Sequence, residues 1–577
     1  MSEITSKLAH LNPFKSRDDD EDLGEAIGAD SVGGGGRATQ RSGYTKGDLR
    51  VSDALRSFLV HHKVITEKDA KETGAVLHEY LSKAVFEVPA ELLDRSHPLP
   101  DYYVSSSHNT YLIAHQLYGK SSASAYETAL KTGSRCVEID AWDNSDDKDE
   151  PKVTHGYTLV SHISFRKVCE TIRDMHDEEA AFAQKHPTSV PGPILVSLEN
   201  HCGPQGQLRL VEIMTEILGD RLLSKPVREE GHREQAGESE HVTLAELGSK
   251  IVIIVEHHLS DEKAEDSEST SDDESNEDEA EERAARKEYN ARKKAEEASP
   301  IIPELAALGV YAQSVKPQNN SWFDPGELTH GPHHHLINVS ETGLSKHLPS
   351  YAVPISVHNS RHLMRVFPKG TRIGSSNLRP VKFWGIGAQI CALNWQTFGL
   401  SNQLNDALFD GSEGYILKPA ALRSGGDGNI ATGKRKKLRL HVAGATDVPL
   451  HSDREEHTLK PYLTCNLYSP LETGEVPKRK TAVYKHHKLG FLHHGDNPER
   501  TDPIWDETLE WEYEDNELVF LRMLIKSDDS WARNPKFAVA AVRLSYVTPG
   551  WTFVRMLDVG GRETKCTLLL NFEITDA

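Results

Sequence analysis

The sequence lacks long apolar runs and closely spaced cysteines. None of its 577 residues belongs to a run of about 18 consecutive apolar residues, so no membrane-spanning helix is expected. The first 30 residues also lack the apolar core of a secretory signal. The six cysteines lie far apart without a CxxC pair, which argues against a disulfide framework and a zinc knuckle. We therefore expect a reduced, cytoplasmic protein.

Basic residues are also too few for a protein that binds nucleic acid. The chain has 66 Lys and Arg against 88 Asp and Glu, a formal net charge of −22. Nucleic-acid-binding proteins normally present a basic face, so we expect no nucleic-acid partner. The acidic excess also argues against general attraction to an anionic membrane, although local basic patches could dock there.

The length predicts about three to four domains, and the apolar pattern places their boundaries. Apolar residues recur at helical spacing between Val51 and Leu81, strands then alternate with helices, and short strands dominate the last part. One of the strands expected after position 301 lies near residues 353–357. The predicted regions are 1–49 (disordered), 50–95 (small helical region), 96–258 (strand–helix), 259–300 (acidic, disordered linker), 301–423 (strand–helix), 424–435 (hinge) and 436–577 (antiparallel sandwich).

Acidic side chains cluster at predicted strand ends. Glu138 and Asp140 are two residues apart on one strand, so both carboxylates share a face. Like charges so placed need a cation between them, or one must take up a proton. Glu199 ends a second strand and Asn109 offers an amide oxygen, which suits calcium or magnesium. A single strand-end acid often only faces solvent, but several at the C-terminal ends of parallel strands are typical of a barrel active site.

Two histidines lie near the same strand ends. His108 and His155 could move protons near neutral pH, although most of the 30 histidines must be surface or packed residues. The other clusters, His330 with 333–335, 486–487 and 493–494, could ligate a transition metal. No strand or helix is predicted to fix their geometry, so we expect solvated loops.

Short motifs in a fixed order resemble a known family. The stretches 107–112 (SHNTYL), 135–143 (RCVEIDAWD), 155–158 (HGYT) and 197–201 (SLENH) look like the X half of eukaryotic phosphoinositide-specific phospholipase C. The stretches 358–359 (HN), 365–372 (RVFPKGTR), 375–377 (SSN), 392–397 (ALNWQT) and 414–419 (GYILKP) look like its Y half. The stretch 502–507 (DPIWDE) resembles a signature of the C2 domain that follows in this family.

The resemblance implies an α/β fold, a TIM-like barrel split into X and Y halves, followed by an all-β C2 sandwich. It makes 50–95 similar to a degenerate EF-hand remnant, in the short architecture of plant and fungal members without a pleckstrin homology domain. By analogy, His108 and His155 are catalytic, with Glu138 accepting a proton. The implied ligands of one calcium ion in the barrel are Asn109, Glu138, Asp140 and Glu199.

The implied activity is calcium-dependent hydrolysis of phosphatidylinositol or its phosphates at a membrane. It gives diacylglycerol and an inositol phosphate through a cyclic phosphate, in lipid signalling, and implies reversible binding to the inner face of membranes. Headgroup contacts fall on Ser376 and Arg372. A membrane-inserting rim is expected, with the structural alternative that each residue merely packs against a neighbouring loop; it comprises Leu117, Tyr157, Leu159 and Phe383.

The sequence departs from the family in two places. Members usually carry two lysines in and after the strand matching 250–255, which grip the ring phosphates; neither is evident here unless Lys250 reaches inward. In the C2 region, Lys460 and Ser527 stand where calcium-binding members have aspartates, although 528–529 remain acidic. We expect weak selection for the bisphosphate and incomplete C2 calcium loops.

Two rival functions remain open. One is a catalytically silent member that binds lipid or protein, which would normally have lost a histidine or a calcium ligand. The other is a calcium-independent lyase of bacterial type, which has a basic residue where the metal would lie, whereas Glu138 and Asp140 are both acids here. The segment 261–282 contains thirteen acidic residues, and we expect this linker either to restrain the enzyme or to be a passive solubilising loop.

Overall fold

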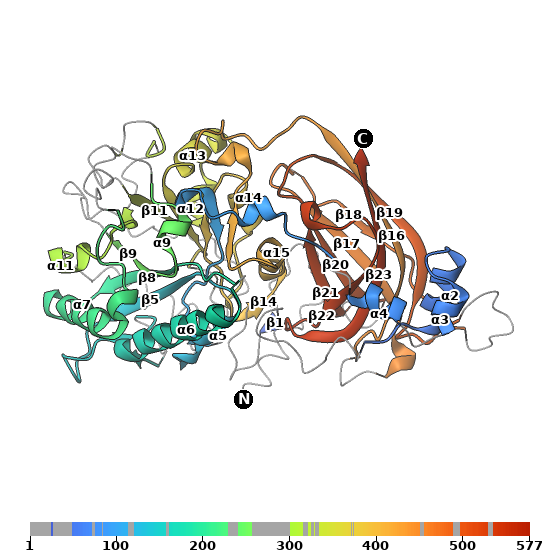
Figure 1. Cartoon of the computed structure of the whole chain (residues 1–577), viewed down its shortest axis with the longest axis horizontal. Coiled ribbons are helices and arrows are strands. Elements are labelled where there is room, and N and C mark those ends of the chain that lie inside the picture. The colour runs from blue at the N-terminus through green and yellow to red at the C-terminus, as the bar shows by residue number, and fades with distance from the viewer. Residues whose placement is uncertain are drawn as a thin grey trace, which may run out of the picture.

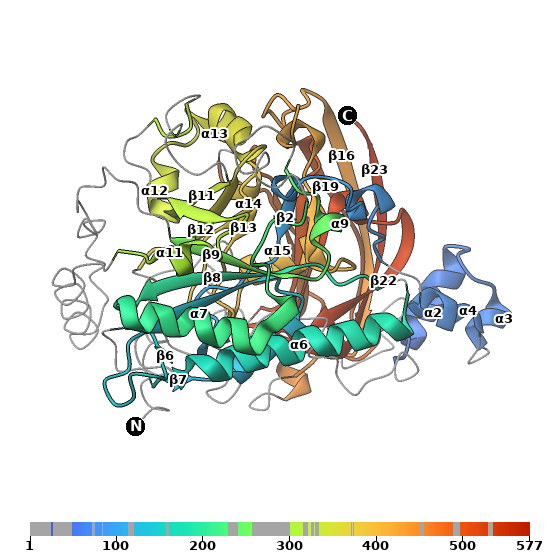
Figure 2. The ribbon, with the colours of Figure 1, turned by 60° about the vertical axis from the view of Figure 1, so that its left-hand side comes forward.

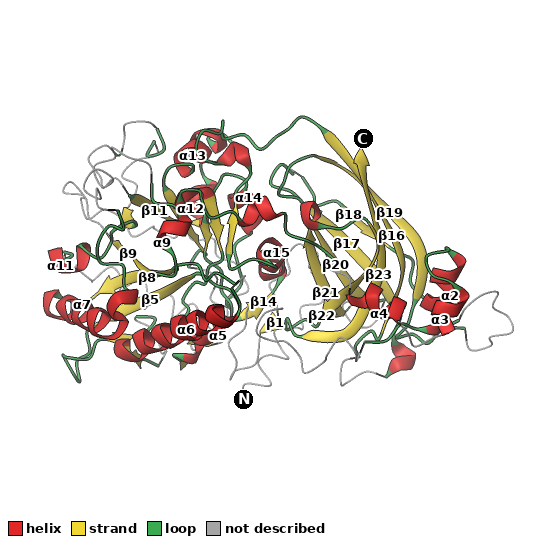
Figure 3. Ribbon diagram, viewed as in Figure 1, coloured by secondary structure: helices red, strands yellow, loops and turns green. Residues whose placement is uncertain are grey.

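The structure is a computed structural model with two bodies that lie side by side, one of mixed strands and helices and one almost entirely of strands (Figures 1 and 3). It describes residues 25–26, 49–71, 75–82, 85–113, 120–156, 161–187, 189–228, 241–256, 300–315, 321–324, 328, 334–370, 372, 374–450, 455–472, 474–487, 497–528 and 535–577. Most of 1–49 and of 259–300, including the acidic stretch, lies outside these residues. None of the helices described here combines the length and apolar character needed to span a bilayer.

The first body is built on parallel strands that form a ring. They are β2 (Tyr102–Val104), β5 (Cys136–Trp142), β8 (Ile194–His201), β9 (Ile251–Glu256), β10 (Gln313–Val315), β11 (His335–Ser340), β12 (Leu363–Phe367) and β13 (Ile390–Cys391). Each strand from β5 to β13 pairs with the next in chain order, and β13 pairs with β2. A bridge between Ser106, just after β2, and Cys136 closes the ring. β15 (Tyr415–Leu417) adds an antiparallel strand beside β2.

Helices cover the outside of the ring, with α6 and α7 in front of β8 (Figure 2). They are α5 (Ser124–Lys131), α6 (Phe165–Lys185), α7 (Pro204–Leu218), α11 (Pro303–Ala306), α12 (Glu341–Ser345), α13 (Ala352–Asn359), α14 (Pro380–Trp384) and α15 (Leu400–Phe409). The short helix α9 (Leu244–Leu247) instead packs its leucines into the apolar cluster inside the ring. In α6, Val168, Ile172 and Met175 are buried at helical spacing, and the Ser164 side chain caps the first turn. The inward face is therefore already visible in the sequence.

One strand prediction was wrong. The stretch 353–357 lies in the helix α13, not in a strand. Its apolar run resembles a buried strand, but Pro354 stands in the first helical turn, where a missing backbone N–H costs no hydrogen bond. A short apolar run fits either a strand or a buried helix, so periodicity alone could not decide between them.

Short strands complete the edges of the first body. β6 (Lys152–Val153) and β7 (Ile163–Ser164) extend the sheet beyond β5, while β3 (Leu112–Ile113) pairs with β4 (Lys120–Ser121). β1 (Glu25–Ala26) pairs with β14 (Thr397–Phe398) in antiparallel fashion. An N-terminal segment thus reaches the loop that follows β13.

The second body is an antiparallel sheet in the order β18-β17-β20-β21-β22-β23-β16-β19. Its strands are β16 (Arg435–Thr446), β17 (Pro461–Tyr468), β18 (Lys478–Lys480), β19 (Ile504–Glu514), β20 (Phe520–Ser527), β21 (Lys536–Arg543), β22 (Gly550–Leu557) and β23 (Glu563–Asp576). Alternate residues of β17, such as Leu463 and Cys465, enter its core. The opposite side meets the first body, where buried Arg522 donates to Gln403 of α15 at 2.7 Å.

Three short helices dock on this second body. They are α2 (Asp53–His61), α3 (Glu67–Lys71) and α4 (Ala75–Ser82). Leu55 and Leu59 of α2 share a core with Ala443 and Leu569 of the sheet. The guanidinium of Arg50 contacts the carboxylates of Asp447 at 2.8 Å and Asp502 at 2.7 Å. The predicted helices are confirmed, and they are stabilised by the sheet rather than standing alone.

Candidate functional site

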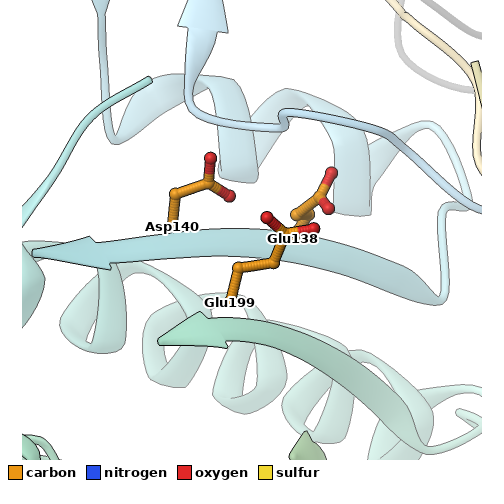
Figure 4. Close-up of side chains that lie close together, drawn as sticks. All are labelled: Glu138, Asp140 and Glu199. Carbon is orange, nitrogen blue, oxygen red and sulfur yellow. The ribbon is translucent and has the colours of Figure 1, made fainter. Parts of the chain in front are cut away.

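Three carboxylates gather at the C-terminal ends of two neighbouring strands of the ring (Figure 4). Glu138 and Asp140 come from β5 and Glu199 from β8, with Asp140 directly opposite Glu199 in the register. One oxygen from each lies within 4.8 Å of the others. Cys136 precedes Glu138 by two residues and Leu195 precedes Glu199 by four, so both share the face of the acids. They belong to an apolar cluster inside the ring. The carboxylates therefore lie against an apolar surface, where a charge without a compensating partner is energetically unfavourable.

Glu138 is fully buried and receives two strong donors. The backbone N–H of Asn109 donates to its Oε2 at 2.6 Å, and the guanidinium of Arg365 donates to its Oε1 at 2.5 Å. Arg365 comes from β12, across the ring, and is itself buried. Asn109 has a φ of 45°, a left-handed conformation that asparagine tolerates better than most residues. The two donors, one of them a guanidinium, compensate the buried Glu138 carboxylate and fix its position.

Asp140 is buried with one oxygen satisfied and one not. The hydroxyl of Tyr111 donates to Oδ2 at 2.6 Å, whereas Oδ1 has no hydrogen-bond partner. Burial, and then the nearby charges of Glu199 and Glu138, raise the pKa of Asp140 well above its usual range. Tyr111 also approaches Oδ1 of Asn109 at 3.1 Å, which brings that amide oxygen beside the acids. Clustered hard oxygen atoms, one of them unsatisfied, fit a calcium or magnesium ion.

His108 lies beside this cluster in a defined tautomer. Its Nδ1 donates to Oδ1 of Asn394 at 2.8 Å, because the Nδ2 of that amide already donates to the carbonyl oxygen of Ser376 at 2.8 Å. Burial first, and then the charge of Arg365, lower the pKa of His108 to about 4. The neutral ring therefore keeps a lone pair on Nε2.

His155 follows β6 and is half-buried. Its neighbour Gly156 sits on the indole of Trp142, so close that a Cβ there would lie 1.9 Å from Cζ2. The indole stacks in turn on His201, with ring centroids 4.0 Å apart. Only glycine fits at position 156, and this contact fixes the backbone that carries His155.

The two expected headgroup residues lie together. Arg372 donates to Ser376 Oγ at 3.2 Å, but its guanidinium also forms an ion pair with Glu341. Desolvation would raise the pKa of Glu341, yet the hydrogen bond and charge of Arg372 hold it below its usual range. The charge of Arg372 is therefore already balanced inside the protein.

The expectation that Phe383 belongs to an exposed rim was wrong. Phe383 lies in α14 with 2% of its surface exposed, inside the main apolar cluster of the ring. An apolar residue in a short helix between two bodies can pack inward, and the sequence does not reveal which side is covered. The other expected rim residues, Leu117, Tyr157 and Leu159, lie outside the described residues.

The expectation of solvated histidine loops was also wrong in part. His334 and His335 are buried at the opposite end of the ring, where β11 begins. Nε2 of His335 lies 3.0 Å from Nε2 of His358, and its ring stacks on His362. His330, His333, His493 and His494 are outside the described part, while His486 and His487 lie in a loop of the second body.

Lys250, which could have contacted a headgroup only by reaching inward, does not do so. It stands at the start of β9 and donates to the carbonyl oxygen of Asp220, so it does not reach the acid cluster. Lys460 and Ser527 lie together, with the Lys460 N–H donating to Ser527 Oγ at 3.0 Å. Among the described residues, Glu138, Asp140 and Glu199 are the one acidic, histidine or cysteine group arranged to hold a metal.

Sequence reasoning missed the roles of three residues of the site. Arg365 balances Glu138 and contacts Asn338 Oδ1 at 3.1 Å, while Tyr111 and Asn394 orient Asp140 and His108. Alternation along 363–367 could have placed Arg365 on the inward face. The partners of Tyr111 and Asn394 depend on strand neighbours that no local pattern reveals.

Comparison with known proteins agrees with this geometry. Models of the X and Y domains of phosphatidylinositol-specific phospholipase C match residues 95–257 and 305–421. The mouse protein named 1-phosphatidylinositol 4,5-bisphosphate phosphodiesterase delta-3 is 31% identical over 493 residues, 84% of this chain and 58% of its own length. The Candida albicans phosphodiesterase 1 of the same name is 28% identical, covering 81% of this chain and 46% of its own.

A solved structure extends the likeness to the whole fold. The crystal structure of L. pealei PLC21 superposes with a TM-score of 0.68 at 22% identity, covering 94% of this chain and 65% of that one. The chain thus spans about half to two thirds of the length of the proteins it matches. The two domain models, their order along the chain and the relatives named above show that this chain belongs to the eukaryotic phosphoinositide-specific phospholipase C family.

Proposed function

We propose that this protein hydrolyses phosphatidylinositol or its phosphates in a calcium-dependent reaction that gives diacylglycerol and an inositol phosphate. The ring is, in this proposal, one TIM-like barrel split into halves at 96–258 and 301–423, and 436–577 form a C2 domain. The helices within 50–95 are the remnant of an EF-hand-like module. The protein acts from the cytoplasm, reversibly at the inner face of membranes.

The observation that carries the proposal is the unsatisfied Oδ1 of Asp140 within a buried acid cluster. Asp140, Glu199, Glu138 and Asn109 would hold one calcium ion there. When bound, calcium would lower the pKa of the inositol 2-hydroxyl and offset the negative charge that develops on the phosphate. Its positive charge also removes the repulsion among the three carboxylates.

The chain's own residues supply the proton transfers. Glu138, held in place by Arg365 and the Asn109 N–H, is positioned to accept the proton of the attacking 2-hydroxyl. His155 protonates the departing diacylglycerol oxygen, and water then opens the cyclic phosphate.

The tautomer of His108 adds a condition to this mechanism. Because Nδ1–H already donates to Asn394, Nε2 can donate to a phosphoryl oxygen only when the ring takes up a proton. A neighbouring anionic phosphate favours that protonated form. We therefore assign His108 a hydrogen bond to the phosphoryl oxygen in the substrate complex, formed together with protonation of its ring.

A calcium titration of hydrolysis with phosphatidylinositol and its phosphates in mixed micelles tests the proposal. Activity should appear with calcium and vanish in excess chelator. His155→Ala should lower turnover by ~10²–10⁴-fold while leaving calcium affinity, measured by isothermal titration, nearly unchanged. Full activity in chelator would contradict the calcium site, and calcium binding without hydrolysis would favour a silent lipid-binding member.

A further inference from the structure

The segment that follows β13 carries the hydrogen-bond partner of His108. Leu393 still bridges to Ser107, but the next residue, Asn394, belongs to no strand or bridge. Asn394 is buried, with 1% of its surface exposed. A buried backbone N–H or C=O needs a partner, so side chains must do here what a neighbouring strand does elsewhere in the ring.

The side chain of Asn377 takes the place of that neighbouring strand. Its Oδ1 accepts from the backbone N–H of Asn394 at 2.6 Å, and its Nδ2 donates to the backbone C=O of Asn394 at 2.8 Å. A backbone N–H can only donate, so the atom that faces it must be the amide oxygen. The carbonyl oxygen of Ser376 accepts from Asn394 Nδ2 at 2.8 Å. The segment 376–377 thus holds Asn394 at three points.

A third asparagine supports this arrangement from α15. Asn402 is 2% exposed, and its Oδ1 accepts from Asn377 Nδ2 at 2.8 Å. Its own Nδ2 donates to the backbone C=O of Asn394 at 3.2 Å. Both hydrogens of the Asn377 amide are therefore used. If the Asn377 amide turned over, donor would face donor at Asn394 and acceptor would face acceptor at Asn402, so one orientation is fixed.

The orientation of these amides passes to the imidazole of His108. Because Asn394 Nδ2 is bonded to the Ser376 carbonyl, Asn394 Oδ1 is the atom 2.8 Å from Nδ1 of His108. Nδ1 therefore carries the ring hydrogen. The ring cannot turn about its Cβ–Cγ bond without breaking this hydrogen bond, so Nε2 keeps one direction. The role proposed for His108, a hydrogen bond from Nε2 to the phosphoryl oxygen, requires such a fixed direction.

Other contacts hold the rest of this segment without Asn377. The indole Nε1 of Trp395 donates to the carbonyl oxygen of Ser106 at 3.0 Å. The amide Nε2 of Gln396 donates to the carbonyl oxygen of Asn109, a proposed calcium ligand, at 3.3 Å. Loss of Asn377 should therefore loosen the amide network while the backbone beside the acid cluster stays in place.

We propose that Asn377 is a positioning residue for the proposed hydrolysis. Through Asn394 it holds the His108 ring with Nδ1 donating to the protein and Nε2 directed toward the phosphoryl oxygen. Asn377 acts through Asn394, and we assign it no contact with substrate or calcium. This role rests on the proposed function and adds to it the group that sets the direction of one catalytic ring.

Steady-state kinetics at saturating calcium test this role, with the phosphoinositide in mixed micelles that the wild type hydrolyses fastest. Asn377→Leu should lower kcat about tenfold and Asn394→Leu by ~10²-fold, because the direction of a hydrogen-bonding group is lost in the transition state. KM and the calcium affinity from isothermal titration should stay within about twofold of wild type, as expected for a contact made in the transition state alone.

Asn377→Asp separates hydrogen bonding from packing. It keeps the shape of the side chain and the acceptor for the Asn394 N–H, but it turns a carboxylate oxygen toward the carbonyl oxygen of Asn394 and toward Asn402 Oδ1. It should lose at least as much kcat as Asn377→Leu. If neither variant folds, Asn402→Leu, which removes one support of the network, should give a smaller fall in kcat.

Asn516 of the second body provides a matched control. Its Oδ1 accepts from the N–H of Leu518 at 2.9 Å and its Nδ2 donates to the C=O of Glu514 at 3.1 Å, so it holds backbone in the same way, away from His108. Asn516→Leu should lower the midpoint of urea unfolding about as much as Asn377→Leu and leave kcat unchanged. A wild-type kcat in the folded Asn377 or Asn402 variants, or a parallel loss of calcium affinity, would overturn the inference.

Nitrogen-15 NMR of histidine-labelled protein separates this role from the proposed function, because it needs no substrate. The His108 signals are identified by their loss in His108→Gln. At neutral pH the wild-type ring should carry its hydrogen on Nδ1, and both tautomers should be populated in Asn377→Leu. If the protein shows this pattern but hydrolyses no lipid, the hydrolysis proposal fails and the positioning of His108 stands. A wild-type ring with its hydrogen on Nε2, or the same tautomer in both proteins, contradicts the inference.

Discussion

The two ends of the ring each bury a cluster of titratable side chains, and the polar atoms of the two clusters are satisfied in different ways. At the C-terminal ends of the strands, Asp140 stands among other acids with one oxygen unsatisfied. At the opposite end, His335 and His358 face each other with their Nε2 atoms 3.0 Å apart, and His362 stacks on His335 at 3.8 Å.

The difference follows from what each group can offer a neighbour. A neutral imidazole has one donor and one acceptor, so two histidines can bond to each other without charge. Burial lowers the pKa of His358 to about 4, which keeps that ring neutral. Ionised carboxylates have acceptors alone, so neighbouring acids repel and need a cation or a proton. The same burial thus produces a self-sufficient cluster at one end and a cation-binding one at the other.

Removing one carboxylate of the acid cluster should have the largest effect on turnover. Asp140→Asn should reduce turnover by ~10³-fold, because a charged oxygen ligand is replaced by a neutral one. It should also weaken calcium binding while stabilising the calcium-free protein, since like-charge repulsion is removed. Initial rates, calcium titration and urea unfolding measure these effects, with Glu91→Gln as an exposed control. Loss of stability without calcium would count against the repulsion.

Removing the buried cation should have the next largest effect. Arg365→Met leaves Glu138 as an uncompensated buried charge, which should cost ~3–5 kcal/mol in the free energy of unfolding. Saturating calcium should recover part of this loss by compensating the same carboxylate. Urea unfolding with calcium and with chelator measures the difference, and Arg365→Lys, which keeps the charge, should lie between. A loss that calcium does not change would mean that Arg365 acts by packing alone.

Acid should weaken the histidine end. The pKa of His358 falls from 6.5 to about 4 on burial, so the unfolded chain binds the proton more tightly and stability decreases as pH falls through this window. At 1.36 kcal/mol per pH unit, the loss between pH 7 and 4 is about 3 kcal/mol. Urea unfolding against pH should show this slope, and His358→Gln should reduce it. An identical slope in the variant would assign the acid sensitivity to other groups.

Much of the acid cluster could be predicted from the sequence. Period-two spacing put Glu138 and Asp140 on one face, and the ends of parallel strands meet at one rim, which brings Glu199 to them. The motifs supplied the family and its histidines. These features are local, because each depends on neighbours within a few residues or on a known order of strands.

What could not be predicted depends on contacts between distant segments. Arg365 reaches Glu138 across the ring, 227 positions away in the chain. Predicting that Phe383 and His335 are buried would require knowing which body or strand covers them, and the hydropathy pattern does not carry that information. The misassigned strand at 353–357 shows the same limit, since its apolar side chains suit either element.

The order of strands in the ring has a consequence for how this gene could be divided. β9 and β10 are hydrogen-bonded neighbours, although 56 positions separate the end of the one from the start of the other, and Val255 pairs with Gln313. A chain cut between them would lose no strand pairing. Two separately encoded polypeptides could therefore associate into a whole ring, but neither alone would contain a working centre, since Glu138 belongs to one and Arg365 to the other.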